Sequence, residues 1–240
     1  MILLFDIGNT RAKYCTMDEG KISCPEAIIN QQLTSHYLSE CFAGITSVII
    51  ASVSNEDITH VIRAWCKSNN IRYRRVLSEK KKNNVTSGYK EPKQLGIDRW
   101  LALIGAAEIY PNKNVLIIDA GTATTIDFIT NEGRHQGGWI LAGIKTLISS
   151  VLAETTKVEA NSMEEESVKF GITSSENVHN AAWASTIGAV HIAISQVKIL
   201  GYELEEIIIT GGNGKVLSSL LSQHNRVIED LVFRGLQAYT

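Results

Sequence analysis

Two short acidic turns carry residue types that could handle a phosphate group. Asp6 and Asp119 each follow a run of apolar residues, and each is followed after one residue by a glycine, with a threonine within the next two positions. Backbone N–H groups of such a turn can bind an anion, and a nearby carboxylate can hold the cation that neutralises it. Both turns therefore predict phosphate and metal binding, although a single Asp-x-Gly turn is also an ordinary chain reversal.

The spacing of these turns predicts two related halves. Asp6 and Asp119 are 113 residues apart in a chain of 240. Each turn joins two strand-like segments, so each half is expected to begin with a β-hairpin. Similarity at this period indicates two copies of one fold, each contributing an acidic turn. We place the two domains at residues 1–112 and 113–240.

A third candidate is the stretch from Tyr89 to Arg99. Pro92 keeps the backbone extended, Gly96 permits a tight turn, and Asp98 is expected at the N-cap of a helix over residues 99–110. Two interpretations stay open at this point. Asp98 only caps the helix and Arg99 makes a surface ion pair, or Asp98 is a general base and Arg99 binds an anionic substrate bidentately.

The remaining pattern is that of an α/β protein. A buried strand at 47–53, an amphipathic helix at 56–68 and a strand at 72–77 predict a βαβ unit. Further helices are expected at 33–43, 144–154, 178–200 and 215–222, and a buried strand is expected at 206–210 before a glycine turn. A basic run at 80–84 and an acidic, polar segment at 159–170 are interpreted as exposed loops. Small residues of the helix at 178–200 suit core packing or a subunit contact: Ala181, Ala182, Ala184, Gly188 and Ala189.

Composition excludes several classes of protein. Hydrophobic residues make up 44% and charged residues 20%, which is ordinary for a globular protein, and a formal charge of −2 favours neither nucleic acid nor an anionic membrane as partner. No stretch is long and apolar enough to span a bilayer, and no export signal is recognised. The four cysteines lack Cys-x-x-Cys spacing, which favours free thiols and a cytoplasmic location. Neither a P-loop nor a Gly-x-Gly-x-x-Gly dinucleotide motif is present.

Four motifs, in this order, resemble those of type III pantothenate kinases, which belong to the superfamily of acetate kinase, sugar kinases and actin. The motifs are Asp6-Ile-Gly-Asn-Thr-Arg-Ala-Lys13, Gly96-Ile-Asp-Arg-Trp100, Asp119-Ala-Gly-Thr-Ala-Thr-Thr-Ile-Asp127, and Gly137-Gly138 followed by Gly143. The resemblance covers essentially the whole chain. It implies two ribonuclease-H-like (actin-like ATPase) domains with mixed sheets flanked by helices, and an active site in the cleft between them.

The resemblance also implies an activity, ATP-dependent phosphorylation of pantothenate at the start of coenzyme A synthesis, by a homodimer. Asp98 is implied as the general base, Asp6 as a ligand on the Mg²⁺ side, and Asp119 as the ligand of a monovalent cation, K⁺ or NH₄⁺. The implied ATP-binding residues are Asp6, Ile7, Gly8, Asn9, Thr10, Arg11, Ala12, Lys13 and Thr122. The implied pantothenate-binding residues are Tyr89, Gly96, Ile97, Asp98 and Arg99, with Thr173 or Ser174 supplied by the other subunit.

One position departs from the family pattern, because Ala142 stands where the family commonly has a proline before Gly143. This change removes no reactive group, but it is expected to loosen a loop. Two alternatives to a pantothenate kinase remain. One is a sugar or acyl kinase of the same superfamily. The other is a nucleotide-binding regulatory module without catalysis, which would not need Asp98.

Overall fold

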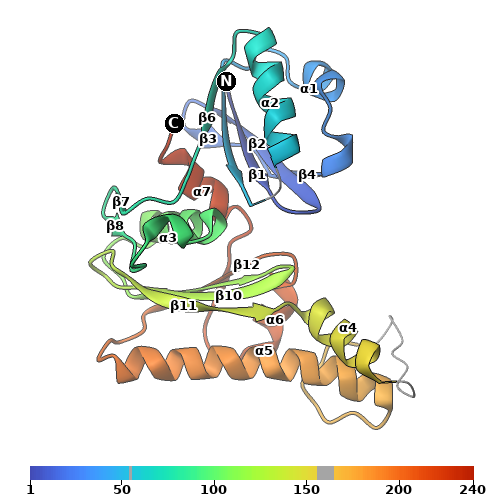
Figure 1. Ribbon diagram of the computed structural model, residues 1–240. Coiled ribbons are helices and arrows are strands. Elements are labelled where there is room, and N and C mark those ends of the chain that lie inside the picture. The colour runs from blue at the N-terminus through green and yellow to red at the C-terminus, as the bar shows by residue number, and fades with distance from the viewer. Residues whose placement is uncertain (54–55, 156–164) are drawn as a thin grey trace. The chain divides into compact units, whose positions relative to one another are not determined.

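The computed structural model describes residues 1–53, 56–155 and 165–240 (Figure 1). Backbone contacts divide the chain into two compact units, residues 1–109 with 230–240, and residues 110–229. The predicted boundary at 112/113 lies close to the first of these divisions. The last eleven residues, however, pack with the first unit, so the contact-defined units are not two continuous halves.

The first unit is built on a mixed six-stranded sheet with the order β3-β2-β1-β5-β6, and β4 pairs with β2. Strand β1 (Ile2–Ile7) pairs antiparallel with β2 (Arg11–Asp18) and parallel with β5 (Ser47–Ser52), which in turn pairs parallel with β6 (Arg72–Arg75). The shorter strands are β3 (Lys21–Ile22) and β4 (Glu26–Ile29). The predicted hairpin and βαβ unit are both confirmed.

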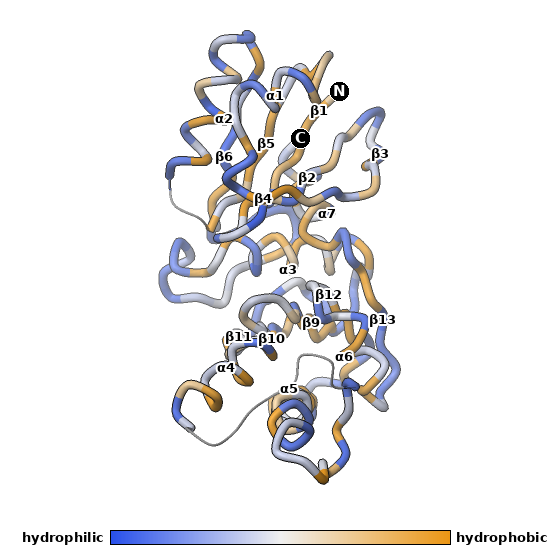
Figure 2. The backbone as a smooth tube through the Cα atoms, turned by 90° about the vertical axis from the view of Figure 1, so that its right-hand side faces the viewer, coloured by the Kyte–Doolittle hydropathy of each residue, from blue (hydrophilic) through white to orange (hydrophobic). Residues whose placement is uncertain are grey.

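Helices cover both faces of this sheet. Helices α1 (Ser35–Cys41) and α2 (Glu56–Ser68) pack on the face that carries Leu3, Phe5 and Ile50. Helices α3 (Ile97–Ile109) and α7 (Leu231–Gln237) pack against each other and against β1 and β5 (Figure 1). The close crossing of α3 and α7 requires glycine, because a Cβ at Gly105 would collide with the Leu231 carbonyl oxygen and one at Gly235 would lie 2.7 Å from the Leu101 carbonyl carbon. Strand β5 has the colour of apolar residues in Figure 2, and four of its six residues are buried.

Between β6 and α3 the chain forms short elements. The basic run that was expected to be a loop is a small hairpin, β7 (Lys81–Lys82) with β8 (Val85–Thr86), closed by Asn83 in the left-handed region (φ 49°). Single 3₁₀ turns, η1 (Asn30–Gln32) and η2 (Pro92–Gln94), precede α1 and α3.

The second unit is built on a five-stranded mixed sheet with the order β11-β10-β9-β12-β13. Strands β9 (Val115–Ala120) and β10 (Ala123–Ile129) form the second predicted hairpin, and β12 (Glu206–Thr210) lies parallel to β9. Strand β11 (His135–Ala142) pairs with β10, and β13 (Arg226–Val227) pairs with β12. Both units thus present an antiparallel hairpin followed by a parallel neighbour, which is the repeat that the two acidic turns predicted.

Helices α4 (Ile144–Glu154), α5 (Ser174–Ile199) and α6 (Gly214–Leu220) complete this unit. Figure 1 shows α5 running along one face of the sheet, where Trp183, Val190 and Val197 join a core with Ile118 and Ile209. The helix at 144–154 is confirmed, and the last two helices are confirmed with earlier starts. The segment predicted as a polar loop at 159–170 lies outside the described residues up to residue 164.

Candidate functional site

The first acidic turn is a tight β1–β2 reversal that a distant asparagine holds in place. The Gly8 N–H donates to the Arg11 carbonyl at 3.0 Å. From η1, the Asn30 side-chain amide donates to the carbonyls of Gly8 (2.8 Å) and Asn9 (3.1 Å), and the Asn30 N–H donates to the Thr10 carbonyl (3.1 Å). Three carbonyls of the turn are thereby satisfied by one residue, which fixes the turn before any ligand binds.

The eight residues of the first motif do not all offer side chains to a ligand. Asn9, Thr10, Arg11 and Lys13 are exposed, and Asp6 and Gly8 are half-buried at the carboxyl end of β1. The side chains of Ile7 and Ala12 are fully buried in the apolar core. Those two positions can therefore contact a nucleotide only through their backbone.

The second acidic turn is assembled from three separate chain segments. Within the turn, the Gly121 N–H donates to the Ala123 carbonyl at 3.0 Å. The Gly143 N–H donates to the Thr122 carbonyl at 3.2 Å, and the Asn213 N–H donates to the Ala120 carbonyl at 2.9 Å. The turn is thus braced by the start of α4 and by the glycine loop after β12.

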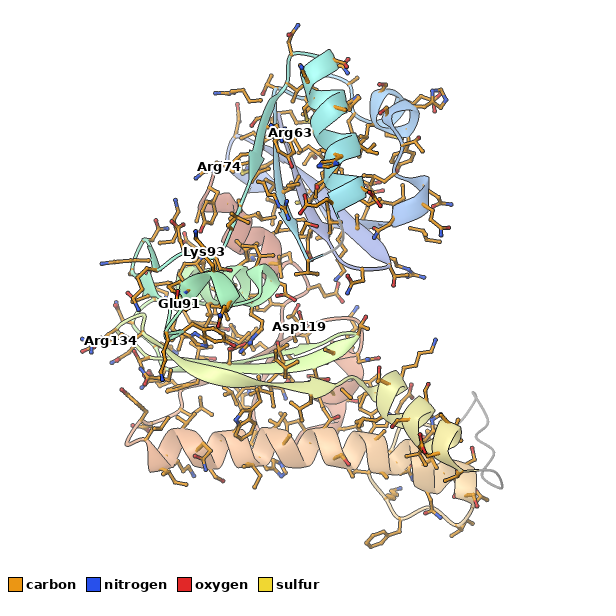
Figure 3. The ribbon with its side chains drawn as sticks, viewed as in Figure 1. Arg63, Arg74, Glu91, Lys93, Asp119 and Arg134 are labelled. Atoms are coloured by element: carbon orange, nitrogen blue, oxygen red, sulfur yellow. The ribbon has the colours of Figure 1, made fainter. Side chains whose placement is uncertain are left out.

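Glycine is required where these segments meet. Gly211 has a φ of +89°, and a Cβ there would collide with the Asp119 carboxylate and lie 2.6 Å from the Ala120 carbonyl carbon. A Cβ at Gly143 would lie 2.6 Å from the Gly121 carbonyl oxygen. The half-buried Asp119 side chain lies at the carboxyl end of β9 (Figure 3) and packs directly against the backbone of Gly211.

Ala142 lies in a strand and not in the expected loop, and its effect relative to proline stays a prediction. Ala142 is the last residue of β11 and pairs with Ala123 of β10, so the ladder holds its backbone. Strand β11 is further joined to β10 by a buried contact of 2.8 Å between His135 Nε2 and Asp127 Oδ1. Asp127, the last residue of the third motif, is therefore a structural partner of β11.

The third candidate stretch brings Tyr89, Asp98 and Arg99 together at the start of α3. Arg99 is buried, with 5% of its surface exposed, and its Nη1 donates to the Tyr89 hydroxyl at 2.7 Å. Its guanidinium also lies over the Tyr89 ring, 5.6 Å from the centroid. A guanidinium that is desolvated and aimed in this way is suited to bind a carboxylate or phosphate.

Asp98 does not occupy the predicted N-cap. The helix begins at Ile97, because the Trp100 N–H already donates to the Gly96 carbonyl at 2.9 Å, and Asp98 lies in the first turn. Its Oδ1 accepts from the Arg99 N–H at 2.8 Å. The side chain is half-buried, which leaves a carboxylate next to the N-terminus of α3.

Thr173 is the N-cap of α5, and its hydroxyl accepts from the Glu176 N–H at 3.1 Å. The Glu176 carboxylate accepts from the Ile172 N–H at 2.7 Å, so side chains satisfy two backbone N–H groups around this helix start. Thr173 and Ser174 are both exposed at this helix start.

The acidic residues suit the cations that phosphoryl transfer needs. Within the described ranges, no three His, Cys, Asp or Glu side chains gather into a metal-binding cluster. Mg²⁺ in kinases is commonly held by one or two carboxylates together with substrate phosphates, and the half-buried Asp6 at the end of β1 fits that mode. A monovalent cation would be held by the Asp119 carboxylate, which is half-buried at the carboxyl end of β9.

Comparison with known proteins now decides the family. The type III pantothenate kinase profile matches residues 2–196. A type III pantothenate kinase of Colwellia psychrerythraea is 45% identical over the full length of both chains. Another, of Pseudoalteromonas translucida, is 35% identical and aligns with 98% of this chain and 94% of its own. The chain belongs to the type III pantothenate kinase family. It is a kinase, and the reaction of its family is pantothenate phosphorylation in coenzyme A synthesis.

Solved structures confirm the fold class. A Baf family protein of Campylobacter jejuni aligns with 98% of this chain and 95% of its own, with a TM-score of 0.63 at 22% identity. A glucokinase from an Antarctic psychrotroph aligns with 99% of this chain and 98% of its own, with a TM-score of 0.51 at 13% identity. These likenesses show the actin-like ATPase and sugar kinase fold. In the part of the chain that the structure describes, no helix is long and apolar enough to cross a membrane.

Sequence reasoning missed two contributors to the candidate site. Asn30 lies 22 residues after Gly8 in a segment without a motif, so nothing local indicates its role. Gly211 was recognised as part of a glycine turn, but its packing against Asp119 was not predicted. The Thr-Gly-Gly sequence was the available signal, and only the pairing of β12 with β9 places it there.

Proposed function

We propose that this chain transfers the terminal phosphoryl group of ATP to the primary hydroxyl of pantothenate, with Asp98 as the general base. The observation that carries the assignment is the arrangement at the start of α3, where the half-buried Asp98 carboxylate accepts from the Arg99 backbone N–H and the buried Arg99 guanidinium is oriented by Tyr89. Phosphoryl transfer depends mainly on positioning and charge neutralisation. An acid–base residue next to an anion-binding residue suits an acceptor that has both a hydroxyl and a carboxylate.

In this proposal, Arg99 binds the pantothenate carboxylate, Tyr89 orients Arg99, and Asp98 takes the proton of the attacking hydroxyl. Gly96 and Ile97 contribute backbone at the same turn. The N–H groups and exposed side chains of residues 6–13 bind the ATP phosphates, and Thr122 contacts ATP from the second turn.

Cations complete the charge balance. Mg²⁺ bound with ATP would be held by Asp6, and K⁺ or NH₄⁺ would be held by Asp119. Their chemistry is the neutralisation of charge on the phosphates, while the protein residues supply orientation and the base.

We further propose a cytoplasmic homodimer in which Thr173 or Ser174 of one subunit reaches the pantothenate of its partner. Support for the dimer comes from the exposed face of α5. Small residues Ala181, Ala184 and Gly188 lie there with Ile192 and Ile199, which are 56% and 72% exposed. Small residues allow close helix packing, and large exposed apolar side chains favour burial.

The test is ADP release by the purified protein with ATP and Mg²⁺, with and without pantothenate, in K⁺ and in Na⁺ buffers. Pantothenate-dependent turnover that requires K⁺ is the expected result. Turnover with a sugar or an acyl acid in place of pantothenate would show that the chain is a kinase for a different acceptor. ATP binding without any acceptor-dependent turnover would show that the chain is a regulatory module.

Asp98→Asn tests the base directly. Asparagine keeps a side-chain oxygen that can accept from the Arg99 N–H, so the helix start is preserved. Turnover is expected to fall by about 10²–10⁴-fold, the usual contribution of general-base catalysis, with little change in the Kd for ATP. Asp18→Asn, at an exposed position of β2, is the matched control. Near wild-type turnover in Asp98→Asn would show that Asp98 is not the general base.

A further inference from the structure

A cavity of about 520 Å³ lies in the first unit, at the edge of the sheet opposite Asp6. Its lining includes Ile2, Ser47 and Arg72, which begin β1, β5 and β6. Asp6 stands near the other end of β1. Because strands β1, β5 and β6 run parallel, the cavity and the phosphate turn occupy opposite edges of one sheet. The kinase site described above does not include the cavity.

Strand register explains why this cavity exists. Ile2 pairs with Ser47 and Ser47 with Arg72, and two residues further along Ile49 pairs with Arg74. Residues two apart on a strand share a face, so these side chains point to the side that α3 and α7 cover. Helix α7 ends at Gln237 and leaves this end of the sheet open, with Tyr239 and Thr240 forming a wall.

The cavity collects positive charge. Arg72 and Arg74 are exposed on the edge strand β6, about 7 Å apart from the strand rise of roughly 3.3 Å per residue (Figure 3 labels Arg74). Lys82 adds a third cation, 4.4 Å from the centroid of the Tyr239 ring, and Arg74 lies 5.1 Å from the same centroid. Among the described residues, none of these three cations forms an ion pair with an acidic side chain.

The geometry around Tyr239 is fixed. Arg74 Nη1 donates to the Tyr239 carbonyl at 2.8 Å. The Tyr239 hydroxyl accepts from Trp100 Nε1 at 2.9 Å and donates to the Glu79 carboxylate at 2.7 Å. The one acidic side chain in these contacts is that of Glu79, and the Tyr239 hydroxyl engages it. The guanidinium of Arg74 is therefore held in place, while Arg72 makes no side-chain hydrogen bond with a described residue.

We propose that this cavity binds a small organic phosphate monoester. Two guanidiniums on alternate residues of one strand can hold different oxygens of one phosphoryl group, and their planar forks match its geometry. A phosphoryl group offers three acceptor oxygens to the two forks, whereas a carboxylate offers two. Ile2 and Ile49 on the floor and the Tyr239 wall accept the organic part. The proposal is independent of the kinase assignment, because it uses none of the residues assigned to catalysis or to ATP.

The test is a calorimetric titration of the full chain with phenyl phosphate, compared with inorganic phosphate, with and without saturating ATP. Wild-type protein is expected to bind phenyl phosphate more tightly than inorganic phosphate, and ATP is expected to leave this binding in place. Arg72→Gln is expected to weaken it about tenfold to a hundredfold, the usual effect of losing a charged hydrogen-bonding partner.

Arg63→Gln is the matched control, because Arg63 is an exposed arginine on α2 (Figure 3) and its loss changes the net charge equally. Pantothenate-dependent turnover is expected to stay unchanged in both variants. Equal binding by wild type and Arg72→Gln would overturn the proposal, as would an equal loss in Arg63→Gln. Complete displacement by ATP would also overturn it, since the probe would then occupy the phosphate turns.

Discussion

At the scale of single residues, the site depends on polar groups that are buried and held by defined hydrogen bonds. Arg99 is the clearest case, since its guanidinium is desolvated at the start of α3 and donates to the Tyr89 hydroxyl. A buried charge without hydrogen bonds is costly, so this contact both stabilises the arginine and aims it.

Tyr89→Phe therefore tests whether the Tyr89 hydroxyl orients the Arg99 guanidinium for substrate binding. The variant keeps the ring against the guanidinium but removes the hydroxyl. We expect the KM for pantothenate to rise about threefold to tenfold, with kcat and the KM for ATP nearly unchanged, because one hydrogen bond is lost. Steady-state kinetics at fixed K⁺ measure this split. Tyr202→Phe is the control, since the Tyr202 hydroxyl makes no hydrogen bond with any described residue and its ring packs on Phe128. An unchanged KM for pantothenate would show that the Tyr89 hydroxyl has no part in substrate binding.

The cysteines give a second prediction at this scale. Burial raises the pKa of the Cys66 thiol to about 11, and burial with the nearby Asp230 charge raises that of Cys15 to about 12. At pH 8 both thiols are therefore almost wholly protonated and unreactive, because the thiolate is the nucleophile. Cys24 and Cys41 are exposed. A thiol-specific chromophoric reagent at pH 8 is expected to label two thiols per native chain and four after unfolding in urea. Four rapidly labelled thiols in the native protein would contradict the burial.

At the scale of elements, each acidic hairpin is completed by a segment distant in sequence. Asn30 fastens the first turn, and the glycine loop after β12 packs against the second. The hairpins supply the carboxylates, whereas the neighbouring segments set the backbone that surrounds them.

Gly211→Ala tests this close packing. The new methyl group would collide with the Asp119 carboxylate in a backbone region that disfavours side chains. The free energy of unfolding is expected to fall by about 1–3 kcal/mol, the usual cost of overpacking, and the K⁺ concentration for half-maximal activity is expected to rise. Urea unfolding and a K⁺ titration of turnover measure the two effects. Gly212→Ala is the matched control, because a Cβ there has open space and a φ outside the left-handed region. Equal stability of the two variants would show that the loop moves away from Asp119.

At the scale of the whole molecule, the proposed dimer is the feature that reaches beyond one chain. Helix α5 has one face in the core of the second unit and another that exposes small and apolar residues.

Ala184→Glu tests whether that face binds a second copy. Glutamate is a good helix former, so α5 is expected to persist while the charge opposes burial. We expect a dimer in wild type and a mass near that of one chain, 26.4 kDa, in the variant. Light scattering after gel filtration measures the mass, and pantothenate turnover should fall with it if the partner supplies Thr173. Ser219→Glu, at an exposed position of α6, is the control. A dimer that survives in Ala184→Glu would place the interface elsewhere.

Sequence by itself determined the features that arise from neighbours along the chain. Apolar runs followed by Asp-x-Gly predicted both hairpins, and alternating and helical periodicities predicted the βαβ unit and most helices, because these patterns report which side chains one element buries. The motif order identified the family. Helix ends were less accurate, as at Asp98, because the Gly96 carbonyl accepts a bond that no residue pattern specified.

Only the tertiary structure decided which distant segments meet. Residues 230–240 join the first unit through the glycines of α3 and α7, Asn30 fastens the first turn, and Gly211 packs on Asp119. The cavity beside Arg72 exists because α7 ends before it covers the sheet. Each of these depends on strand register and helix packing between residues far apart in the chain. Local residue preferences do not encode such contacts, since their free energy appears only after the elements have assembled.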